Sequence, residues 1–266
     1  MDKSEQRAEM PKGKNSVLDR RTVVNGNANL LKIIRRDDHV LDVGCGSGAI
    51  TKDIASLVGA GGSVLGIDSS VHLIEQAKND FAKLPNLSFE VADIKAYSAD
   101  KLMDVVTSAR VLQWLSHPAE VVIKLTSLVK PGGWLTILDY NHEKVEFNPP
   151  IPPSMQLFYN NFLQWRSDAG MDNGIADNLK DIFAHAGLVD ITEDDYAEVS
   201  ISGKQTFLEE IDIWIKVAEG RGPQLVKDGY ITESERLLAI TDYGTWIKNE
   251  AKYMKLYLKA VTGRKV

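Results

Sequence analysis

A glycine-rich turn preceded by a carboxylate is the segment whose residue types and spacing are best suited to chemistry. Residues 40–48 predict a buried strand that carries Asp42 and enters a turn with Gly44, Gly46 and Gly48. Glycines let a backbone bend sharply and lie against a ligand without side chains in the way. The helix expected after the turn presents unpaired N–H groups at its N-terminus to an electron-rich group of a ligand. The segment therefore predicts a binding site for a small ligand.

Two classes of ligand are compatible with such a turn, a dinucleotide and S-adenosylmethionine. Gly44-x-Gly46-x-x-Ala49 matches the dinucleotide pattern, and Asp68 follows at a spacing suited to a ribose. Asp42 separates the two ligands, because its carboxylate would repel a diphosphate and attract an ammonium or a sulfonium. Unit charges about 4 Å apart interact by about 4 kcal/mol, before desolvation, at an effective dielectric of about 20. A P-loop is excluded, since no Gly-Lys-Ser/Thr follows the turn.

Four further segments follow the turn in a fixed order along the chain. They are residues 66–69, 92–94, 107–114 and 128–133. Together with Asp42-x-Gly44-x-Gly46-x-Gly48, they resemble the motifs of class I S-adenosylmethionine-dependent methyltransferases, especially the branch that includes ubiquinone and menaquinone biosynthesis methyltransferases. The resemblance extends over residues 25–140 and implies S-adenosylmethionine as cofactor and S-adenosylhomocysteine as product.

Residue chemistry and the resemblance together imply a set of cofactor contacts. Asp42 would orient the ammonium, Asp68 would accept both ribose hydroxyls, and Asp93 would take the adenine amino group. For Asp68 and Asp93 the alternative is a helix cap or turn residue. The full set of expected contacts is Asp42, Gly44, Cys45, Gly46, Gly48, Asp68, Ser69, Ala92, Asp93, Ile94, Ser108, Ala109 and Arg21.

The remaining members of this set are expected to act mainly through their backbones. The glycines allow close approach of the methionine part, and Cys45 contributes backbone with an inert thiol. Backbone groups near Ala92 and Ile94 would hold the adenine edge, and carbonyls of Ser108 and Ala109 would lie near the ammonium. Arg20 or Arg21 would reach the methionine carboxylate, or else would lie on a solvated face.

The acceptor pocket is expected beyond the carboxyl ends of the strands, as in other open α/β sheets. Tyr140 and His142 directly follow the fifth predicted strand and are the candidate catalytic residues. His142 is the leading candidate for a base, and the alternative is a loop histidine bonded to backbone. An inserted segment with Trp214, Tyr243 and Trp246 would close as a lid and favour an apolar or cationic acceptor. O-, N- and C-methylation all stay open.

The elements that position these residues alternate between strand and helix. Apolar runs predict strands at residues 39–43, 63–67, 87–91, 103–107 and 134–138, with helices at 22–35, 49–58, 71–84 and 119–129. This alternation predicts an α/β fold with a doubly wound, mostly parallel sheet. The resemblance implies a Rossmann-like, seven-stranded sheet, in which residues 253–261 form an antiparallel C-terminal strand.

After residue 140 the alternation of strands and helices breaks. Four prolines between residues 149 and 153 argue that residues 141–155 are neither regular helix nor central strand. Helices are predicted at 155–168, 174–186, 205–219 and 232–249, with short strands at 189–191 and 197–200. We expect a single domain over residues 1–266, with a core at 22–140 and 174–266 and helical lid insertions at 141–170 and 201–250. Residues 1–19 are expected to be a flexible lead-in.

Composition narrows the class of protein. The 266 residues carry a net charge of −6 without a dense basic run, which argues against nucleic acid as a partner. The single cysteine excludes an internal disulfide and a cysteine-built zinc site, and no metal is expected. The polar first residues argue against a secretory signal, and no apolar run suffices to span a membrane. These features favour a cytoplasmic enzyme acting on a small-molecule acceptor, and they leave its oligomeric state open.

Three other functions remain as alternatives. An NAD-dependent oxidoreductase is disfavoured by Asp42 and by the lack of a Tyr-x-x-x-Lys motif. A non-catalytic S-adenosylmethionine-binding protein is compatible with the same turn. A nucleic-acid or protein methyltransferase is disfavoured by the acidic balance, and residues 107–110 lack the Asn/Asp-Pro-Pro-Tyr/Phe motif of enzymes that methylate bases.

Overall fold

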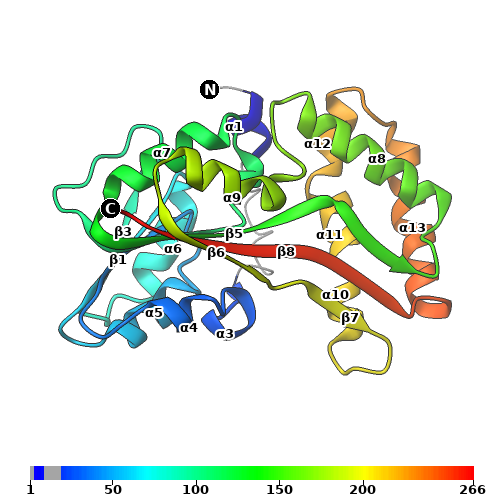
Figure 1. Ribbon diagram of the computed structural model, residues 1–266. Coiled ribbons are helices and arrows are strands. Elements are labelled where there is room, and N and C mark those ends of the chain that lie inside the picture. Colours follow the sequence, from blue (N-terminus) through cyan, green and yellow to red (C-terminus); the bar gives the residue numbers. More distant parts are fainter. Residues whose placement is uncertain (1–2, 9–18) are drawn as a thin grey trace.

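A central sheet of eight strands runs through the whole molecule (Figure 1). The computed structural model describes residues 3–8 and 19–266. The strands are β1 (His39–Val43), β2 (Ser63–Asp68), β3 (Leu87–Val91), β4 (Met103–Ala109), β5 (Val129–Asn148), β6 (Val189–Asp195), β7 (Glu198–Ile201) and β8 (Tyr253–Arg264). Their order is β3-β2-β1-β4-β5-β8-β6, and β7 also pairs with β8.

The first five strands are parallel and the C-terminal strand is antiparallel. β1 pairs in parallel with β2 and β4, whereas β8 is antiparallel to β5, β6 and β7. β6 and β7 pair with successive stretches of β8, so the eight strands occupy seven lateral positions. The predicted mostly parallel sheet with an antiparallel final strand is confirmed.

Helices cover both faces of the parallel half, as side-chain alternation along β1 requires. Val40 packs in one cluster with Ile54 of α5 (Thr51–Val58). Helices α3 (Val23–Gly26) and α4 (Leu30–Ile33) also contribute residues to this cluster. Leu41 packs on the opposite face with residues of α7 (Pro118–Leu128) and α9 (Ile175–His185). α6 (Val71–Asp80) packs against Phe89 of β3. The carboxyl ends of the strands are therefore held between two layers of helices.

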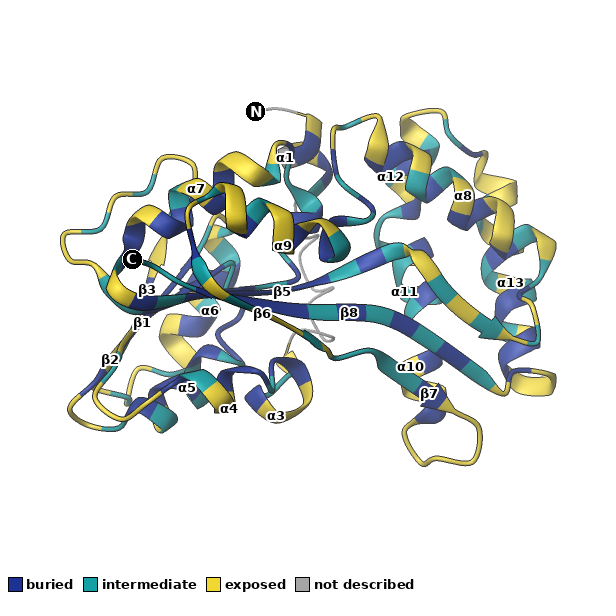
Figure 2. Ribbon diagram, viewed as in Figure 1, coloured by how far each residue is buried: buried dark blue, intermediate teal, exposed yellow. Residues whose placement is uncertain are grey.

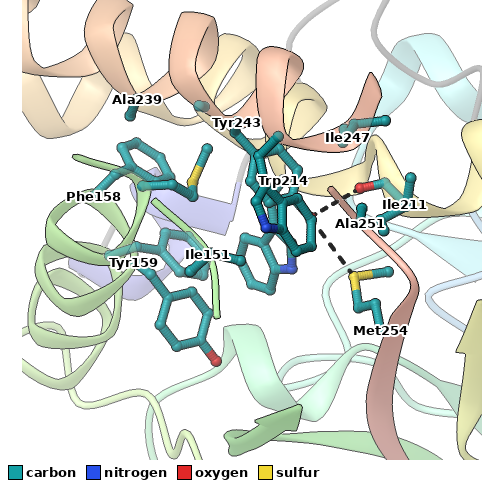
Figure 3. Packing of buried hydrophobic residues seen from close by; sticks show 14 of the residues in the cluster. Ile151, Phe158, Tyr159, Ile211, Trp214, Ala239, Tyr243, Ile247, Ala251 and Met254 are labelled. Carbon is teal, nitrogen blue, oxygen red and sulfur yellow. Dashed lines mark hydrogen bonds between the residues drawn. The ribbon is translucent and has the colours of Figure 1, made fainter. Parts of the chain in front are cut away.

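A second hydrophobic core lies at the other end of the molecule (Figure 3). Five helices build it: α8 (Pro153–Ser167), α10 (Phe207–Ile211), α11 (Ile213–Gly220), α12 (Gly222–Lys227) and α13 (Glu233–Asn249). Phe158, Tyr243 and Trp246 are buried there, and the Tyr243 hydroxyl donates to the Ile211 carbonyl at 3.1 Å. β5 and β8 extend from the parallel half into this helical end, which ties the two cores together (Figure 1).

The length of β5 corrects the predicted irregular segment at 141–155. The strand continues to Asn148, because β8 pairs with it from Trp134 to Asn141 and again from Glu146 to Asn148. The register shifts between Asn141 and Glu146, which is the only trace of an interruption in this pairing. The prolines begin directly after the strand, where a missing N–H costs no ladder hydrogen bond.

The predicted helices and the expected lead-in also differ in detail from the structure. The predicted helix at 22–35 is two short helices, α3 and α4, because the chain leaves the first helix at Asn27 and re-enters a helix at Leu30. α12 was not predicted. Residues 3–8 of the expected flexible lead-in form α1 (Lys3–Ala8), whose Ser4 and Arg7 are buried. Figure 2 shows dark, buried bands on this helix. The rest of that expectation, residues 1–2 and 9–18, lies outside the described residues.

Helices long and apolar enough to cross a bilayer are absent from the described ranges, 3–8 and 19–266.

Candidate active site

A cavity of about 840 Å³ opens at the carboxyl ends of the parallel strands. Strands β1, β2, β4 and β5 contribute Val43, Asp68, Ala109 and Tyr140 to its lining. The opposite wall comes from the helical end, mainly from α11. The predicted location of the site, beyond the strand ends, matches the place where an open α/β sheet binds its ligands.

The glycine turn forms one end of this cavity. Gly44, Gly46 and Gly48 have φ angles of 72°, 56° and 78°, in the left-handed region that favours glycine. A Cβ atom on Gly44 would lie 2.2 Å from Cγ2 of Val111, which also lines the cavity. Gly48 does not line the cavity, and a Cβ there would lie 2.6 Å from Cζ of Phe89. Gly48 is therefore required for packing the turn on β3, and Gly44 and Gly46 face the ligand space.

Most amides of the turn donate hydrogen bonds inside the protein. Gly44 and Cys45 both donate to the Ile67 carbonyl, at 2.8 and 3.1 Å, and Gly48 donates to the Cys45 carbonyl at 3.0 Å. Gly46 donates to Oδ2 of Asp68 at 2.9 Å. The expected free N–H groups are thus absent at these four positions. The turn is therefore poorly suited to bind a diphosphate.

Asp42 is a buried carboxylate on the floor of the cavity. It is 5% exposed, and its Oδ2 accepts a hydrogen bond from the Thr51 hydroxyl at 2.7 Å. Burial raises the pKa of Asp42 to about 6, and the negative charge of Asp68 adds to this, although Thr51 opposes it. Among the described residues no cation pairs with Asp42. A positively charged ligand would offset the cost of this buried charge.

Asp68 joins the second strand to the glycine turn. Its Oδ2 accepts from the Gly46 amide, and its Oδ1 accepts from the Ser70 amide at 2.8 Å. Burial raises the pKa of Asp68, and these two amides oppose the rise. Each carboxylate oxygen keeps a second lone pair for a ligand donor. Asp68 is therefore a turn residue, as in the alternative interpretation, and it also lines the cavity.

The predicted adenine contacts also line the cavity. Ser69 and Asp93 are exposed, Ala92 is half-buried, and Ile94 is buried. Oδ1 of Asp93 accepts from the Lys95 amide at 3.0 Å, so this side chain holds a local turn. The Ala92 amide donates to the Asp68 carbonyl at 3.0 Å, which joins the two loops.

The segment after β4 divides between structure and cavity. Ala109 lines the cavity, whereas Ser108 does not; it is fully buried, and its hydroxyl donates to the Val43 carbonyl at 2.9 Å. Cys45 lines the cavity, and burial raises the pKa of its thiol well above 9.0, as expected of an unreactive cysteine.

Arg21 is the arginine of the N-terminal pair that lies in the cavity. Burial lowers its pKa, and the charge of Arg110 lowers it further. Arg20 instead contacts Glu209 with its side chain exposed. Within the described chain, no carboxylate is paired with the Arg21 guanidinium by a hydrogen bond or ion pair. Arg21 is thus a desolvated cation available to an anionic ligand group.

A buried cluster that the sequence did not reveal holds Tyr140. The guanidinium of Arg110 donates to the Tyr140 hydroxyl at 3.0 Å and to Glu198 at 2.6 Å, and Tyr140 donates to Glu198 at 2.9 Å. Burial raises the pKa of Tyr140. With its proton engaged by Glu198, Tyr140 is poorly suited to act as a base. Glu198 lies on edge strand β7, and its position on the chain gave no signal of this contact.

His142 lies deep in the acceptor part of the cavity. Its Nε2 is 2.5 Å from Oε1 of Gln113, and its amide donates to the Asn173 carbonyl at 2.8 Å. Burial lowers the pKa of His142 well below 6.5, and the positive charge of Arg166 lowers it further. The imidazole is therefore neutral near pH 7 and able to accept a proton. The backbone-bonded alternative is not seen for the ring.

Aromatic side chains surround His142. Its ring centroid lies 6.2 Å from that of Phe162 and 6.5 Å from that of Trp214, both in edge-on geometry. Two guanidinium groups, of Arg166 and Arg221, lie over the ring of Trp114, each 4.6 Å from its centroid. All three of these aromatic residues line the cavity.

Of the aromatic residues predicted to form a lid, only Trp214 reaches the cavity. Tyr243 and Trp246 are stacked at 5.1 Å inside the helical core, so that part of the prediction was wrong. α1 adds to the cover, since Ala8 lines the cavity and the Arg221 guanidinium donates to the carbonyls of Arg7 and Ala8.

More than half of the chain matches a known protein family. Residues 34–187 match the methyltransferase domain family, which is more than half of the chain. The protein therefore belongs to this family, and the predicted resemblance is confirmed.

Curated relatives match less than half of the chain. A ubiquinone biosynthesis O-methyltransferase of Albidiferax ferrireducens is 37% identical over 112 residues, which are 41% of this chain and 43% of that protein. A trans-aconitate 2-methyltransferase of Methylobacterium radiotolerans is 35% identical over 97 residues, 36% of each chain. The matched part of the chain spans less than half the length of these relatives.

Solved structures share the fold over almost the whole chain. Phosphoethanolamine N-methyltransferase 2 of Haemonchus contortus, in complex with phosphomonomethylethanolamine and S-adenosylhomocysteine, superposes with a TM-score of 0.59 at 15% identity, covering 95% of this chain and 56% of that one. A SAM-dependent methyltransferase of Aquifex aeolicus has a TM-score of 0.55 at 18% identity, covering 97% and 100%. At these identities the likeness concerns the fold alone.

Proposed function

We propose that the protein transfers a methyl group from S-adenosylmethionine to a small-molecule acceptor. The observation that carries this proposal is the buried carboxylate of Asp42, beside the desolvated carboxylate of Asp68, at a glycine turn with four amides already engaged. A cationic ligand compensates these charges, and a diphosphate would add to them. Membership of the methyltransferase family supports the same conclusion.

The residues of the cofactor half fit the parts of S-adenosylmethionine. Asp42 would stabilise the ammonium, and Arg21 would bind the carboxylate of the methionine part. Asp68 would accept from the ribose hydroxyls through its two remaining lone pairs. Residues 92–94 would contact the adenine. When bound, the cofactor supplies a methyl group on a positively charged sulfur, and the C–S bond breaks as an acceptor atom attacks in line from the opposite side.

The acceptor half of the cavity supplies position and a proton acceptor. His142, Phe162 and Trp214 form apolar walls that hold a ring or chain close to the methyl donor and exclude water. Positioning of this kind contributes about 7–11 kcal/mol to catalysis. When the acceptor atom carries a hydrogen, neutral His142 takes that proton.

The charge of the acceptor half favours an acceptor without a positive charge. From Ala109 onward, the charged residues that line the cavity are Arg110, Lys216 and Arg221, of which Arg110 is paired with Glu198 and Lys216 with Asp212. Among the described residues, no Asp or Glu from this part of the chain lines the cavity. Of the two predicted acceptor types, the apolar one therefore fits better than the cationic one.

A screen with methyl-labelled S-adenosylmethionine tests the proposed function. Purified protein is incubated with pools of small neutral and anionic metabolites, and label is followed into the small-molecule fraction. We expect label in at least one pool, and at least ~10-fold less turnover with His142→Ala for an acceptor that must lose a proton. Absence of transfer to every pool, from protein that binds S-adenosylhomocysteine, would favour the non-catalytic alternative.

A further inference from the structure

Gln113 is the only side chain that hydrogen-bonds the imidazole of His142 in the described part of the chain. It lies on η1 (Leu112–Trp114), which follows β4, and it is 3% exposed. The contact joins residues 29 positions apart and is not assigned by any of the motifs above.

The backbone of Gln113 is fixed from two sides by buried charged groups. Its amide donates to Oδ2 of Asp139 at 3.1 Å, and its carbonyl accepts from Nη2 of Arg166 at 2.7 Å. Both Asp139 and Arg166 are fully buried. The side chain of Gln113 therefore extends from a rigid point.

The orientation of the Gln113 amide follows from its second partner. Nε2 of Gln113 donates to the Arg110 carbonyl at 3.2 Å. A carbonyl oxygen only accepts, so the nitrogen of the amide must face Arg110, and Oε1 must face His142. Oε1 is also only an acceptor, so Nε2 of His142 must carry the hydrogen in this contact.

The other nitrogen of the ring then has a free lone pair. In a neutral imidazole with a hydrogen on Nε2, Nδ1 is the acceptor. Nδ1 makes no hydrogen bond within the described residues. It is also not one of the buried polar atoms that lack a hydrogen-bond partner, so it is not closed off from the cavity. Because His142 lines the cavity, Nδ1 is accessible from the space that the acceptor would occupy.

We propose that Gln113 is a positioning residue that holds His142 as the Nε2-protonated tautomer and so makes Nδ1 the proton acceptor of the site. The catalytic part of this inference rests on the proposed function, whereas the tautomer of His142 does not depend on that function. The proton moves from the acceptor atom to Nδ1, the acceptor keeps the electron pair that bonds to the methyl carbon, and His142 becomes a cation.

Nitrogen NMR of the protein labelled with ¹⁵N-histidine measures the tautomer directly. The chain has five histidines, and His142 is assigned from the signal lost in His142→Gln. We expect an Nε2-protonated, neutral ring in the wild type, and a mixture of tautomers in Gln113→Leu. A hydrogen on Nδ1 in the wild type, or an unchanged tautomer in Gln113→Leu, would overturn the inference.

Gln113→Glu is the conservative variant, since it keeps an acceptor oxygen in the same place. The charged or titratable groups near the ring are Tyr140 on the same strand and Arg166 on α8; Tyr159 on α8 donates to the His142 carbonyl, and Trp214 on α11 carries no charge. A carboxylate added to this set raises the pKa of His142. We expect retention of the tautomer and movement of the acidic limb of the kcat profile to higher pH.

Kinetics separate positioning from simple structural support. With an acceptor from the methyl-label screen, we expect kcat to fall at least ~10-fold in Gln113→Leu and to recover in Gln113→Glu at high pH. Equal losses in both variants would contradict the positioning role. Calorimetry with S-adenosylhomocysteine shows whether each variant is folded, and failure of the wild type to bind it would refute the proposed function without altering the tautomer result.

Discussion

Two aspartates, Asp42 and Asp68, determine the electrostatics of the cofactor half at the scale of single residues. Both carboxylates are desolvated, and both have raised pKa values. Neither is neutralised by a cation in the described part of the chain. A buried charge that the fold alone does not compensate is typical of groups kept for a ligand.

Asp42→Asn should stabilise the ligand-free protein while weakening cofactor binding. The folded pKa, about 6, lies above the ordinary 3.8, so ionisation costs stability. This cost is absent below about pH 4, grows as pH rises, and is complete above about pH 6; the shift corresponds to about 3 kcal/mol. Thermal unfolding at pH 7.5 and pH 4 measures it. Equal Tm values for the variant and the wild type at pH 7.5 would show that the ionised Asp42 side chain does not lower the stability of the folded protein.

Asp68→Asn should weaken S-adenosylhomocysteine binding by about 10- to 100-fold, the equivalent of about 1.5–3 kcal/mol for hydrogen bonds to a charged group. The change removes the charge and one acceptor oxygen, and with them the bond from the Gly46 amide or the contact with the ribose. Asp80→Asn is the matched control, because it makes the same change at an exposed side chain of α6 that does not line the cavity. Calorimetry measures both, and an affinity loss no greater for Asp68→Asn than for the control would contradict the assigned role.

At the scale of elements, the glycine turn and the end of β4 approach each other closely. Val111 fills the space where a side chain on Gly44 would lie, so the two segments form one wall of the cavity. The left-handed backbone of Arg110, with φ at 62°, turns its side chain toward Tyr140 and Glu198. Element geometry therefore shapes the cavity as much as side-chain chemistry does.

Gly44→Ala should cost more stability than Gly132→Ala. Both glycines have positive φ, at 72° and 80°, and a left-handed alanine costs about 1–2 kcal/mol. Only at Gly44 does the new Cβ meet a neighbour, Val111 at 2.2 Å, whereas nothing lies within 4 Å at Gly132. Urea denaturation gives the difference, and calorimetry should show loss of S-adenosylhomocysteine binding for Gly44→Ala alone. Similar values for the two variants would contradict the close approach.

Local patterns in the sequence predict most of the strands and helices. Features that depend on contacts between distant residues could not be predicted in this way. The strands and the glycine turn follow from apolar runs and from Gly44 and Gly46, which lie two positions apart along the chain. The extension of β5 depends on β8, which lies more than 100 residues away, as the pair Asn148 and Tyr253 shows. The contact of Gln113 with His142 has the same origin, because no local pattern specifies which side chain will face a ring.

At the scale of the whole molecule, two hydrophobic cores share two long strands. β5 and β8 pair from Trp134 with Arg264 to Asn148 with Tyr253, and so they cross both cores. The cavity lies between the cores, with the cofactor half on the parallel sheet and the acceptor wall on the helical end. This arrangement explains why the family match, residues 34–187, omits much of the acceptor wall.

Phe158→Ala, in the helical core, should lower the free energy of unfolding of the whole chain. Phe158 is 1% exposed, and loss of a buried phenylalanine side chain costs about 3–5 kcal/mol. Leu157→Ala on the same helix is the control, since that side chain is 43% exposed. Because the strands are shared, we expect one transition by both near- and far-UV circular dichroism. Two separate transitions would indicate that the cores unfold independently.

Parallel calorimetric titrations of the wild-type protein with S-adenosylhomocysteine and with NAD test the central claim most directly. The buried carboxylates and the internally bonded turn predict saturable binding of S-adenosylhomocysteine and no binding of NAD. Tight binding of NAD, with no heat from S-adenosylhomocysteine, would contradict the account.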